Sequence, residues 1–389
     1  MLELEALQAN DGDCLLLHSE GGSKPSLILI DGGSRGIYRD VLEKRLDQLR
    51  AKRPSLDLRM VIVSHIDADH ITGILDMFRD MSESVDNGAE PKWKVASLWH
   101  NSFENLAGSH SASARTATVA AAAAGKLEVA GLVGRGLTDE KATAVVASVR
   151  QGKELRGFAT KLKTAINRET KGKLIVAPAT GTNKIRITDD LTFTILGPRT
   201  EELENLQHEW EKSKAKHAAD EQAVAADYLN RTVPNLSSIV FLAEQDNTEG
   251  KTTRILITGD AGGDLILKGL GSAGLLDVEG RIKVDVLKLQ HHGSKHSVDE
   301  GFFRRVIADA YMISGNGRHG IPHIETLDWL SHARAGNAID VYMTNRRLED
   351  GGEDLTRGLD EFLGKEKKEE PEHRYHFRAE DKLSITAGE

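Results

Sequence analysis

The sequence predicts an α/β protein whose strand-rich core is interrupted by two helical insertions. Short runs of leucine, isoleucine and valine, bounded by glycine or polar residues, are typical of buried strands and occur in both halves of the chain. Two long stretches have few strand formers and a helical spacing of apolar residues. A chain of 389 residues is long enough to bury a sizeable core, and we expect a single domain over residues 1–389.

The expected elements are taken in chain order. Buried strands are expected at residues 15–17, 27–30, 60–63, 174–176, 185–187, 193–195, 238–241, 254–257, 284–287 and 383–385. Helical spacing predicts a helix over residues 40–52. The helical insertions cover about 102–172, which is dense in alanine, and about 200–232, which is polar and rich in lysine. The charged, glycine-punctuated segment at about 350–372 predicts a mobile loop before the last strand.

Composition argues against several classes of protein. No run approaches the roughly 18–20 apolar residues that cross a bilayer. The first residues are acidic and lack the basic start and apolar core of a signal peptide. The single cysteine, Cys14, cannot form an intrachain disulfide and fits a reducing compartment. We therefore expect a cytoplasmic protein with no membrane partner.

The net charge of −9 argues against a surface that attracts nucleic acid as a whole. A local lane of cations could still contact a phosphate backbone, while a solvated helix face would show the same pattern. The lane consists of Arg150, Lys153, Arg156, Lys161, Lys163 and Arg168.

Four side chains of the metal-ligand type lie within six residues, immediately after the expected strand at 60–63. They are His65, Asp67, Asp69 and His70. The ends of strands are where α/β folds place their sites. Burying so many polar groups is costly unless a cation compensates them. This segment therefore predicts a metal site, and Gly73 would let the following helix start close to it.

Other expected strands also end in ligand-type residues. Asp260 follows the strand at 254–257 and is suited to bridging two cations. His291 and His292 follow the strand at 284–287, and His100 follows the apolar pair at 98–99. Each signal alone is weak, but four strand ends that offer ligands in one chain favour a metal centre.

This order of motifs resembles the metallo-β-lactamase superfamily, whose first motif is normally His-x-His-x-Asp-His. An aspartate at position 67 in place of the second histidine resembles the nuclease domain of ComEC-type DNA-uptake proteins. The resemblance covers about 1–100 and 174–345 and omits both insertions. The segments that carry it are Gly12-Asp13-Cys14, Asp31-Gly32-Gly33, Leu196-Gly197-Pro198, Asn235-Leu236-Ser237-Ser238, Thr258-Gly259-Asp260 and His291-His292-Gly293-Ser294.

The resemblance implies an αββα sandwich with a two-metal site. His65, Asp67 and His100 would hold one metal, and Asp69, His70 and a later histidine would hold the second. Asp260 would bridge the two metals, and Asp69 would also orient the attacking hydroxide. The ions would be zinc or manganese, since histidines suit zinc and each carboxylate favours harder ions.

Between the two neighbouring histidines, we favour His291 as the ligand and His292 as a catalytic contact to the phosphoryl oxygen. A Tyr-Gly-His-Pro-like turn of such domains is replaced here by residues 318–323, with Ile321 at the histidine position. His319 or His323 would substitute for that histidine. Ser294 and Lys295 would hold an anionic substrate, although a plain turn would have the same sequence.

The resemblance favours a phosphodiesterase, with DNA or RNA as the substrate. The acidic net charge favours an alternative, a small-molecule hydrolase acting on a lactone, thioester or phosphoester. A binding module without turnover is disfavoured by the complete ligand set. Residues 200–232 have the composition of a lid or a protease-sensitive activation segment, which would make a regulatory protein or a protease a partner. A solvated helix would have the same composition, and the oligomeric state is left open.

Overall fold

A computed structural model describes residues 1–21, 25–101, 139–201, 203, 238–246, 250–378 and 382–387, with the backbone alone described for 139–149 and 382. The expected insertions therefore fall largely outside the described residues. Of the first, the structure describes only the part from residue 139 onward, which begins with a helix. The second insertion, at about 200–232, lies almost entirely outside the described residues.

The first sheet has seven strands in the order β17-β1-β2-β3-β4-β5-β6. The strands from β17 to β3 pair antiparallel, and those from β3 to β6 pair parallel. The strands are Leu2–Leu7 (β1), Leu15–Ser19 (β2), Ser26–Ile30 (β3), Leu58–Ile62 (β4), Ser97–Trp99 (β5), Ala165–Ile166 (β6) and Lys382–Ala387 (β17).

The second sheet has eight strands in the order β16-β13-β12-β11-β10-β9-β8-β7. The strands from β10 to β16 in this order are parallel, and those from β7 to β10 are antiparallel. The strands are Asn183–Arg186 (β7), Leu191–Gly197 (β8), Val240–Asp246 (β9), Thr252–Ile257 (β10), Ile282–Lys288 (β11), Val306–Ile313 (β12), Ile339–Met343 (β13) and His373–Phe377 (β16).

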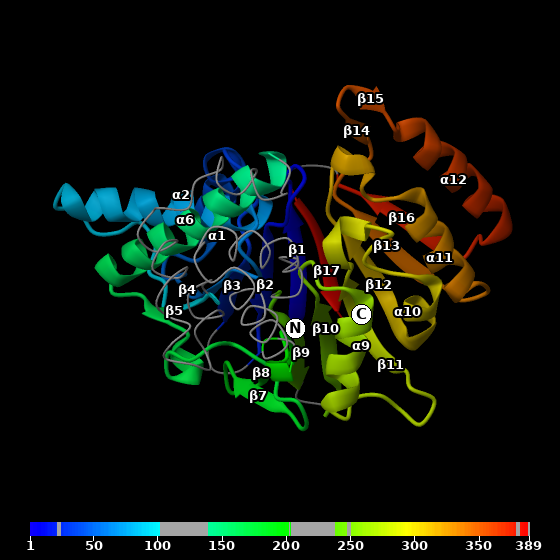
Figure 1. Ribbon diagram of the computed structural model, residues 1–389, viewed down its shortest axis with the longest axis horizontal. Helices are drawn as coiled ribbons and strands as arrows, with labels where there is room; N and C mark the ends of the chain where they lie inside the picture. Colours follow the sequence, from blue (N-terminus) through cyan, green and yellow to red (C-terminus); the bar gives the residue numbers. More distant parts are fainter. Residues whose placement is uncertain are drawn as a thin grey trace, which may run out of the picture.

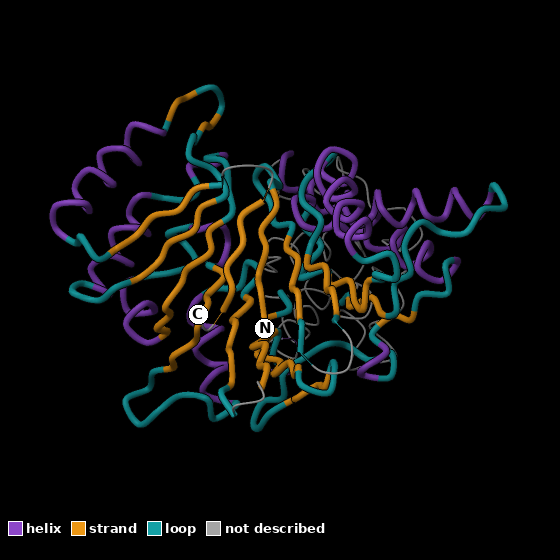
Figure 2. The backbone as a smooth tube through the Cα atoms, turned by 180° about the vertical axis from the view of Figure 1, so that it is seen from behind, coloured by secondary structure: helices purple, strands orange, loops and turns teal. Residues whose placement is uncertain are grey.

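Helices cover the outer face of each sheet (Figures 1 and 2). The first sheet carries η1 (Tyr38–Leu42), α1 (Glu43–Lys52), α2 (Ala68–Asp86) and α6 (Asp139–Lys161). The second carries α9 (Gly263–Ser272), α10 (Glu300–Arg305), α11 (Ile324–Arg334) and α12 (Thr356–Glu369). Each of these helices buries apolar side chains against its sheet, as amphipathic surface helices do.

The inner faces of the two sheets share one hydrophobic core. At its centre, the rings of Phe193 and Phe241 from the second sheet stack at 4.4 Å, and Trp99 from the first sheet meets both of them edge-on. Fully buried strands explain why the sequence shows continuous apolar runs rather than alternation. Helices, two face-to-face sheets and helices make four layers, so the predicted αββα sandwich is confirmed.

Two expected elements differ from the structure. The mobile loop predicted at 350–372 is wrong, because most of that segment is the hairpin of β14 (Glu349–Asp350) and β15 (Glu353–Asp354) followed by α12. Leu359 and Phe362 lie one turn apart on α12 and are buried in the core of the second sheet, which outweighs the charged composition. Residues 174–176 form no strand, although Ile175 is buried and bonded through its backbone to Asn101.

The parallel strands of both sheets place their carboxyl ends at the same edge of the sandwich. Residue 31 follows β3, residues 64–70 follow β4, and residue 100 follows β5. In the second sheet, residue 260 follows β10 and residues 290–293 follow β11. Among the described helices, none combines the length and the apolar character that a membrane crossing requires.

Candidate metal centre

The loop after β4 leads directly into α2. His65 is buried at the strand end, Asp67 is the N-terminal flanking residue of α2, and Asp69 and His70 lie in its first turn. Negative charge is stabilised near the amino end of a helix, which supports the ionised form of Asp69. The helix therefore presents two of the four side chains from one turn.

Glycines let this turn approach the neighbouring loops closely. A Cβ atom on Gly73 would lie 1.8 Å from the backbone oxygen of Gly32, and one on Gly12 would lie 1.8 Å from that of Asp69. The backbone nitrogen of Gly32 also donates to the His70 carbonyl at 2.8 Å. No side chain fits at either contact, so these glycines set the position of the helix start.

One group of side chains surrounds Oδ2 of Asp260. His65 Nε2 lies 3.7 Å from this oxygen and 3.6 Å from Oδ2 of Asp67. His291 Nε2 lies 3.7 Å from the same oxygen. Two ligands about 2.0–2.1 Å from one tetrahedral ion stand roughly 3.4 Å apart. These separations are therefore close to those of ligands that share an ion, and they exceed hydrogen-bond length.

A second group surrounds Oδ1 of Asp260. His70 Nε2 lies 3.4 Å from this oxygen and 3.6 Å from Oδ2 of Asp69. His292 Nε2 lies 3.8 Å from Oδ1 of Asp260 and 3.5 Å from the same Asp69 oxygen. The Asp260 carboxylate therefore stands between two sets of ligand atoms, one facing each oxygen.

His291 and His292 reach opposite oxygens of Asp260 because the chain takes a left-handed turn there. Their φ angles are 45° and 53°, which are uncommon for residues with a side chain. The His291 backbone nitrogen is held by the Gly259 carbonyl at 3.1 Å. Sparsely populated backbone conformations are concentrated at functional sites, where surrounding contacts maintain them.

Several atoms that face the space between these side chains are buried and have no hydrogen-bond partner. They are Nε2 of His65, His70 and His292, and Oδ1 of Asp260. Buried polar atoms are nearly always satisfied, and leaving one unsatisfied is costly. Divalent cations satisfy such a set of nitrogen and oxygen atoms, so the residues present fit a pair of metal ions.

The other ring nitrogen of each histidine is hydrogen-bonded to a fixed partner. Such contacts from outside the ligand set orient metal-binding histidines. The Nδ1 contacts are His65 to Ser64 Oγ (3.0 Å), His70 to Asp31 Oδ2 (2.9 Å), His291 to Ser297 Oγ (2.9 Å) and His292 to Ser314 Oγ (3.2 Å). In all four rings the Nε2 atom is thus the one directed to the centre.

Burial and opposite charges compete in setting the pKa values of the cluster. Burial lowers the pKa of His292, but the carboxylates of Asp260 and Asp13 outweigh it and raise this pKa to about 9. Burial raises the pKa of Asp69, but His70 and His292 lower it to about 2. Protons and metal ions thus compete for the same nitrogen atoms, as they do at metal sites generally.

His100 is not among the histidines whose ring nitrogens lie within 4.0 Å of the Asp260 carboxylate. Its ring is fully buried beside Gly152 of α6, and neither ring nitrogen has a hydrogen-bond partner. Burial and the charge of Arg156 lower its pKa to about 3. The structure places His291, rather than His100, beside the same Asp260 oxygen as His65.

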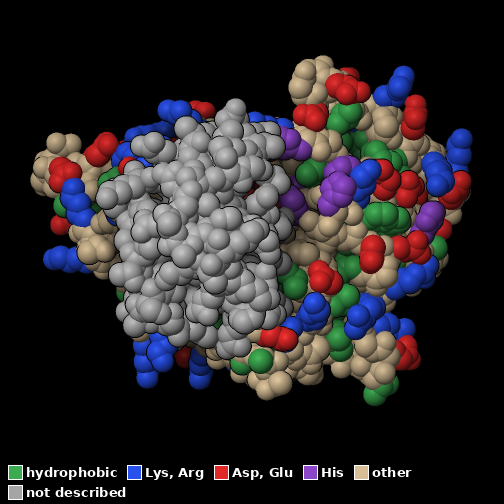
Figure 3. Space-filling view, in the orientation of Figure 1, with side chains coloured by type: hydrophobic (Ala, Val, Ile, Leu, Met, Phe, Trp, Pro, Cys, Tyr) green, Lys and Arg blue, Asp and Glu red, His purple; other side chains and the backbone are tan. Residues whose placement is uncertain are grey.

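The other expected site residues are Ser294, Lys295, His319 and His323. His319 is exposed, and Ser294 is buried with its hydroxyl accepting a bond from the His296 backbone nitrogen. The Lys295 ammonium donates to Glu325 at 2.5 Å. His323 accepts from the Lys295 backbone nitrogen at 3.3 Å. Histidine side chains gather beside the region drawn in grey on the face shown in Figure 3.

Sequence reasoning assigned no role to three residues that lie behind the ligand atoms. Asp31 accepts from His70 and from both the backbone nitrogen and hydroxyl of Ser64. Asp13 and Lys288 form a fully buried ion pair at 2.8 Å beside His292. In the sequence, only their positions beside glycine, in two of the segments that carry the family resemblance, could have pointed to Asp13 and Asp31 as site residues.

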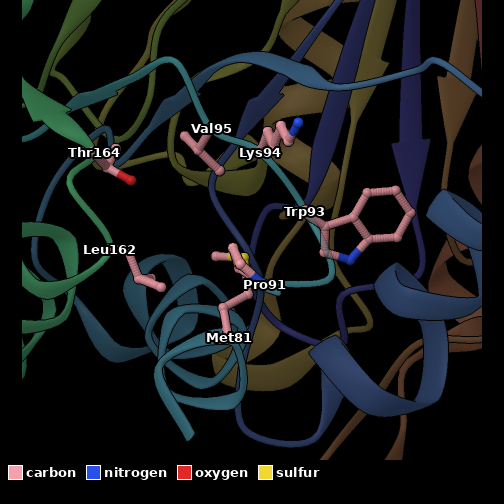
Figure 4. Close-up of a pocket in the computed structure, with 7 residues that line it drawn as sticks. All are labelled: Met81, Pro91, Trp93, Lys94, Val95, Leu162 and Thr164. Carbon is pink, nitrogen blue, oxygen red and sulfur yellow. The ribbon is translucent and has the colours of Figure 1, made fainter. Parts of the chain in front are cut away.

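A cavity of about 210 Å³ lies at another part of the first sheet (Figure 4). Met81, Trp93, Val95 and Leu162 are among the side chains that line it. Met81 follows Asp69 by twelve residues of α2, or about 18 Å along a helix axis. This cavity is therefore separate from the candidate metal centre.

No family model matches the sequence, and no curated protein matches it. Among solved structures, the chain is similar to the metallo-β-lactamase fold protein YhfI from Bacillus subtilis, with 11% identity, 99% of each chain covered and a TM-score of 0.38. It is also similar to unliganded yeast PDE1, with 10% identity, 98% of each chain covered and a TM-score of 0.40. A sandwich with buried ligand-type side chains at one edge fits a metal-dependent hydrolase.

Proposed function

We propose that this chain is a dinuclear metal-dependent hydrolase of the metallo-β-lactamase superfamily, and that it cleaves phosphodiester bonds in DNA or RNA. The observation that carries the proposal is the Asp260 carboxylate, which has a separate set of ligand atoms facing each oxygen. One carboxylate between two such sets could bridge a pair of metal ions that act together on a phosphodiester.

The residues divide between two positions. His65, Asp67 and His291 would hold one ion, Asp69, His70 and His292 would hold the other, and Asp260 would bridge them. A pair of divalent ions, when bound, supplies Lewis acidity and activates water for in-line displacement. Asp69 has 29% of its side chain exposed, so it can orient the attacking water. Four imidazoles with three carboxylates suit zinc or manganese.

Nucleic acid is favoured as the substrate by the position of α6. Gly152 of this helix lies against Ile66 and His100, so the helix passes beside the loop that carries the ligand-type residues at this point. Arg150 and Lys153 are exposed within one turn of Gly152. These two cationic side chains would contact the phosphates of a nucleic acid, although the chain as a whole is acidic. Binding there would weaken steeply with salt.

The test compares the unaltered protein with Asp69→Ala on plasmid, single-stranded DNA, RNA and bis-p-nitrophenyl phosphate, with manganese or zinc present. We expect metal-dependent cleavage by the unaltered protein and a loss of at least 100-fold in the variant, the scale of losing a positioned proton acceptor. Equal, metal-independent cleavage by both proteins would indicate a contaminating nuclease.

The second candidate is a small-molecule hydrolase, which the net charge of −9 favours because a small substrate needs no basic track. The same preparation tested on a lactone and a thioester separates the two functions. Good turnover of either compound, with no cleavage of DNA, RNA or the phosphodiester, would establish this second function.

A further inference from the structure

Three buried residues lie behind His292, on the side of the ring away from Asp260. The Ser314 hydroxyl lies 3.2 Å from His292 Nδ1 and donates to Oδ1 of Asp13. The Lys288 ammonium lies 2.8 Å from Oδ2 of Asp13. All three are at most 2% exposed, so water cannot replace these contacts.

Asp13 belongs to a group of four ligand-type residues whose atoms lie within 4.8 Å of one another, the others being His70, Asp260 and His292. Its contacts nevertheless identify it as a residue outside the ligand set. One of its oxygens accepts from Ser314 and the other faces Lys288. It also lies beside Nδ1 of His292, whereas Nε2 of that ring faces Asp260.

We infer that Asp13, acting through Ser314, is a positioning residue that fixes the His292 ring with Nε2 directed at the second metal position. Because the Ser314 hydroxyl donates its only proton to Asp13, it accepts a hydrogen bond from His292 Nδ1. That bond fixes the ring tautomer and leaves the lone pair on Nε2. The inference rests on the proposed two-metal function.

Lys288 has a separate part in this arrangement. A carboxylate buried without a cation would be strongly destabilising, and the ammonium compensates it. The Lys288 ammonium also donates to the Leu289 carbonyl at 3.0 Å, which fixes its own position. Lys288, the last residue of β11, therefore holds Asp13 in place. Asp13 in turn holds Ser314, which follows β12.

The contacts also connect the two sheets. Asp13 comes from the loop between β1 and β2, whereas Lys288 ends β11 of the second sheet, His292 follows β11 and Ser314 follows β12. Asp69 and His70, which face the same Asp260 oxygen as His292, follow a strand of the first sheet. A carboxylate from the first sheet therefore orients the histidine that the second sheet contributes to this position.

The test is titration of the metal-free protein with Co²⁺, in which the heat of binding and the visible d–d absorption are measured. The variants are Ser314→Ala, Asp13→Asn and the double variant Asp13→Asn with Lys288→Met, which removes both charges. The matched control is Glu5→Gln, because Glu5 is also a fully buried carboxylate, but it is paired with Arg45 and His18 outside the centre.

We expect two equivalents of Co²⁺ in the unaltered protein and in Glu5→Gln. In Ser314→Ala and Asp13→Asn, one equivalent should bind 10- to 100-fold more weakly with a changed spectrum, while the other is unchanged. Two unchanged equivalents in Ser314→Ala would overturn the inference, whatever the stability of the other variants. No bound Co²⁺ in the unaltered protein would instead overturn the proposed function.

Discussion

Among single residues, Asp260 is the one whose replacement we expect to impair metal binding and hydrolysis most. Its oxygens face different histidines, His65 and His291 on one side and His70 and His292 on the other. Its pKa is held well below the usual range, because the neighbouring histidines outweigh the effect of burial. Asp260 is therefore an ionised carboxylate on which both proposed metal positions depend.

We expect Asp260→Ala to abolish hydrolysis and to weaken the binding of both ions, since the shared ligand is removed. Metal content by elemental analysis should fall from about two equivalents to less than one. The matched control is Asp264→Ala, four residues further on, whose side chain is 72% exposed. Full activity in Asp260→Ala would contradict the bridging role.

Asp67→His should be milder. The Asp67 side chain is 34% exposed, so the variant ring has room, and it offers a nitrogen in place of a carboxylate oxygen. Softer ligands favour zinc over manganese. Competition between the two metals, measured on reconstituted protein, should shift toward zinc while both equivalents remain bound. An unchanged zinc-to-manganese ratio would argue against Asp67 as a ligand.

Some residues of the candidate metal centre could be predicted from the sequence, and others could not. The four ligand-type residues after β4 could be recognised because they follow one strand closely. We expected only His291 as a ligand, yet both His291 and His292 face Asp260, because the chain takes a left-handed turn that no spacing reveals. Asp13 meets Lys288 across 275 positions of sequence, and a single sequence gives no signal for such a distant pair.

At the scale of elements, α12 shows how a charged sequence can still form a packed helix. Glu366 of this helix is almost fully buried and accepts hydrogen bonds from His373 Nδ1, Ser331 and Tyr375. His373 Nε2 also lies 3.4 Å from the Arg334 carbonyl. The contacts join α11, α12 and β16, and composition alone does not reveal them, so it predicted a loop here.

This cluster predicts a dependence of stability on pH. Burial lowers the pKa of His373, but Glu366, the Arg334 carbonyl and Glu370 outweigh it and raise this pKa above its ordinary value of 6.5. A raised pKa in the folded state contributes stability that is complete below about pH 6.5. That stability is lost as the pH rises through the raised value.

His373→Gln should therefore cost more stability at pH 6 than at pH 9. Urea unfolding of both proteins at the two pH values measures the difference in the free energy of unfolding. His376→Gln is the control, since this neighbouring residue of β16 is bonded to Asp340 at the surface. An equal cost of His373→Gln at both pH values would show that the charge of His373 does not contribute.

At the scale of the whole molecule, the candidate metal centre is built from ligand-type residues of both sheets. Asp67 and His70 follow a strand of the first sheet, and Asp260 and His292 follow strands of the second. The sandwich itself could be predicted from the apolar runs and the order of motifs. Its strand order could not, because β1 and β17 pair across almost the entire sequence.

Because the ligands come from both sheets, metal removal should lower the melting temperature. An ion present at about 1,000 times its dissociation constant stabilises the folded state by roughly 4 kcal/mol. Calorimetry with chelator, and again after manganese or zinc is restored, should show a reversible shift of several degrees. The Asp260→Ala protein should show a much smaller shift, and an equal shift in both would place the stabilising ion elsewhere.

The pairing of β17 with β1 has a consequence for folding during synthesis. The backbone of β1 is hydrogen-bonded on one side to β2 and on the other to residues 382–387. β2 is synthesised directly after β1, whereas residues 382–387 are among the last to be synthesised. Until those residues emerge, β1 is an open edge of the first sheet, and such edges template the pairing of other chains. Truncation before residue 382 should therefore promote aggregation, even though it removes none of the residues assigned to the metal centre.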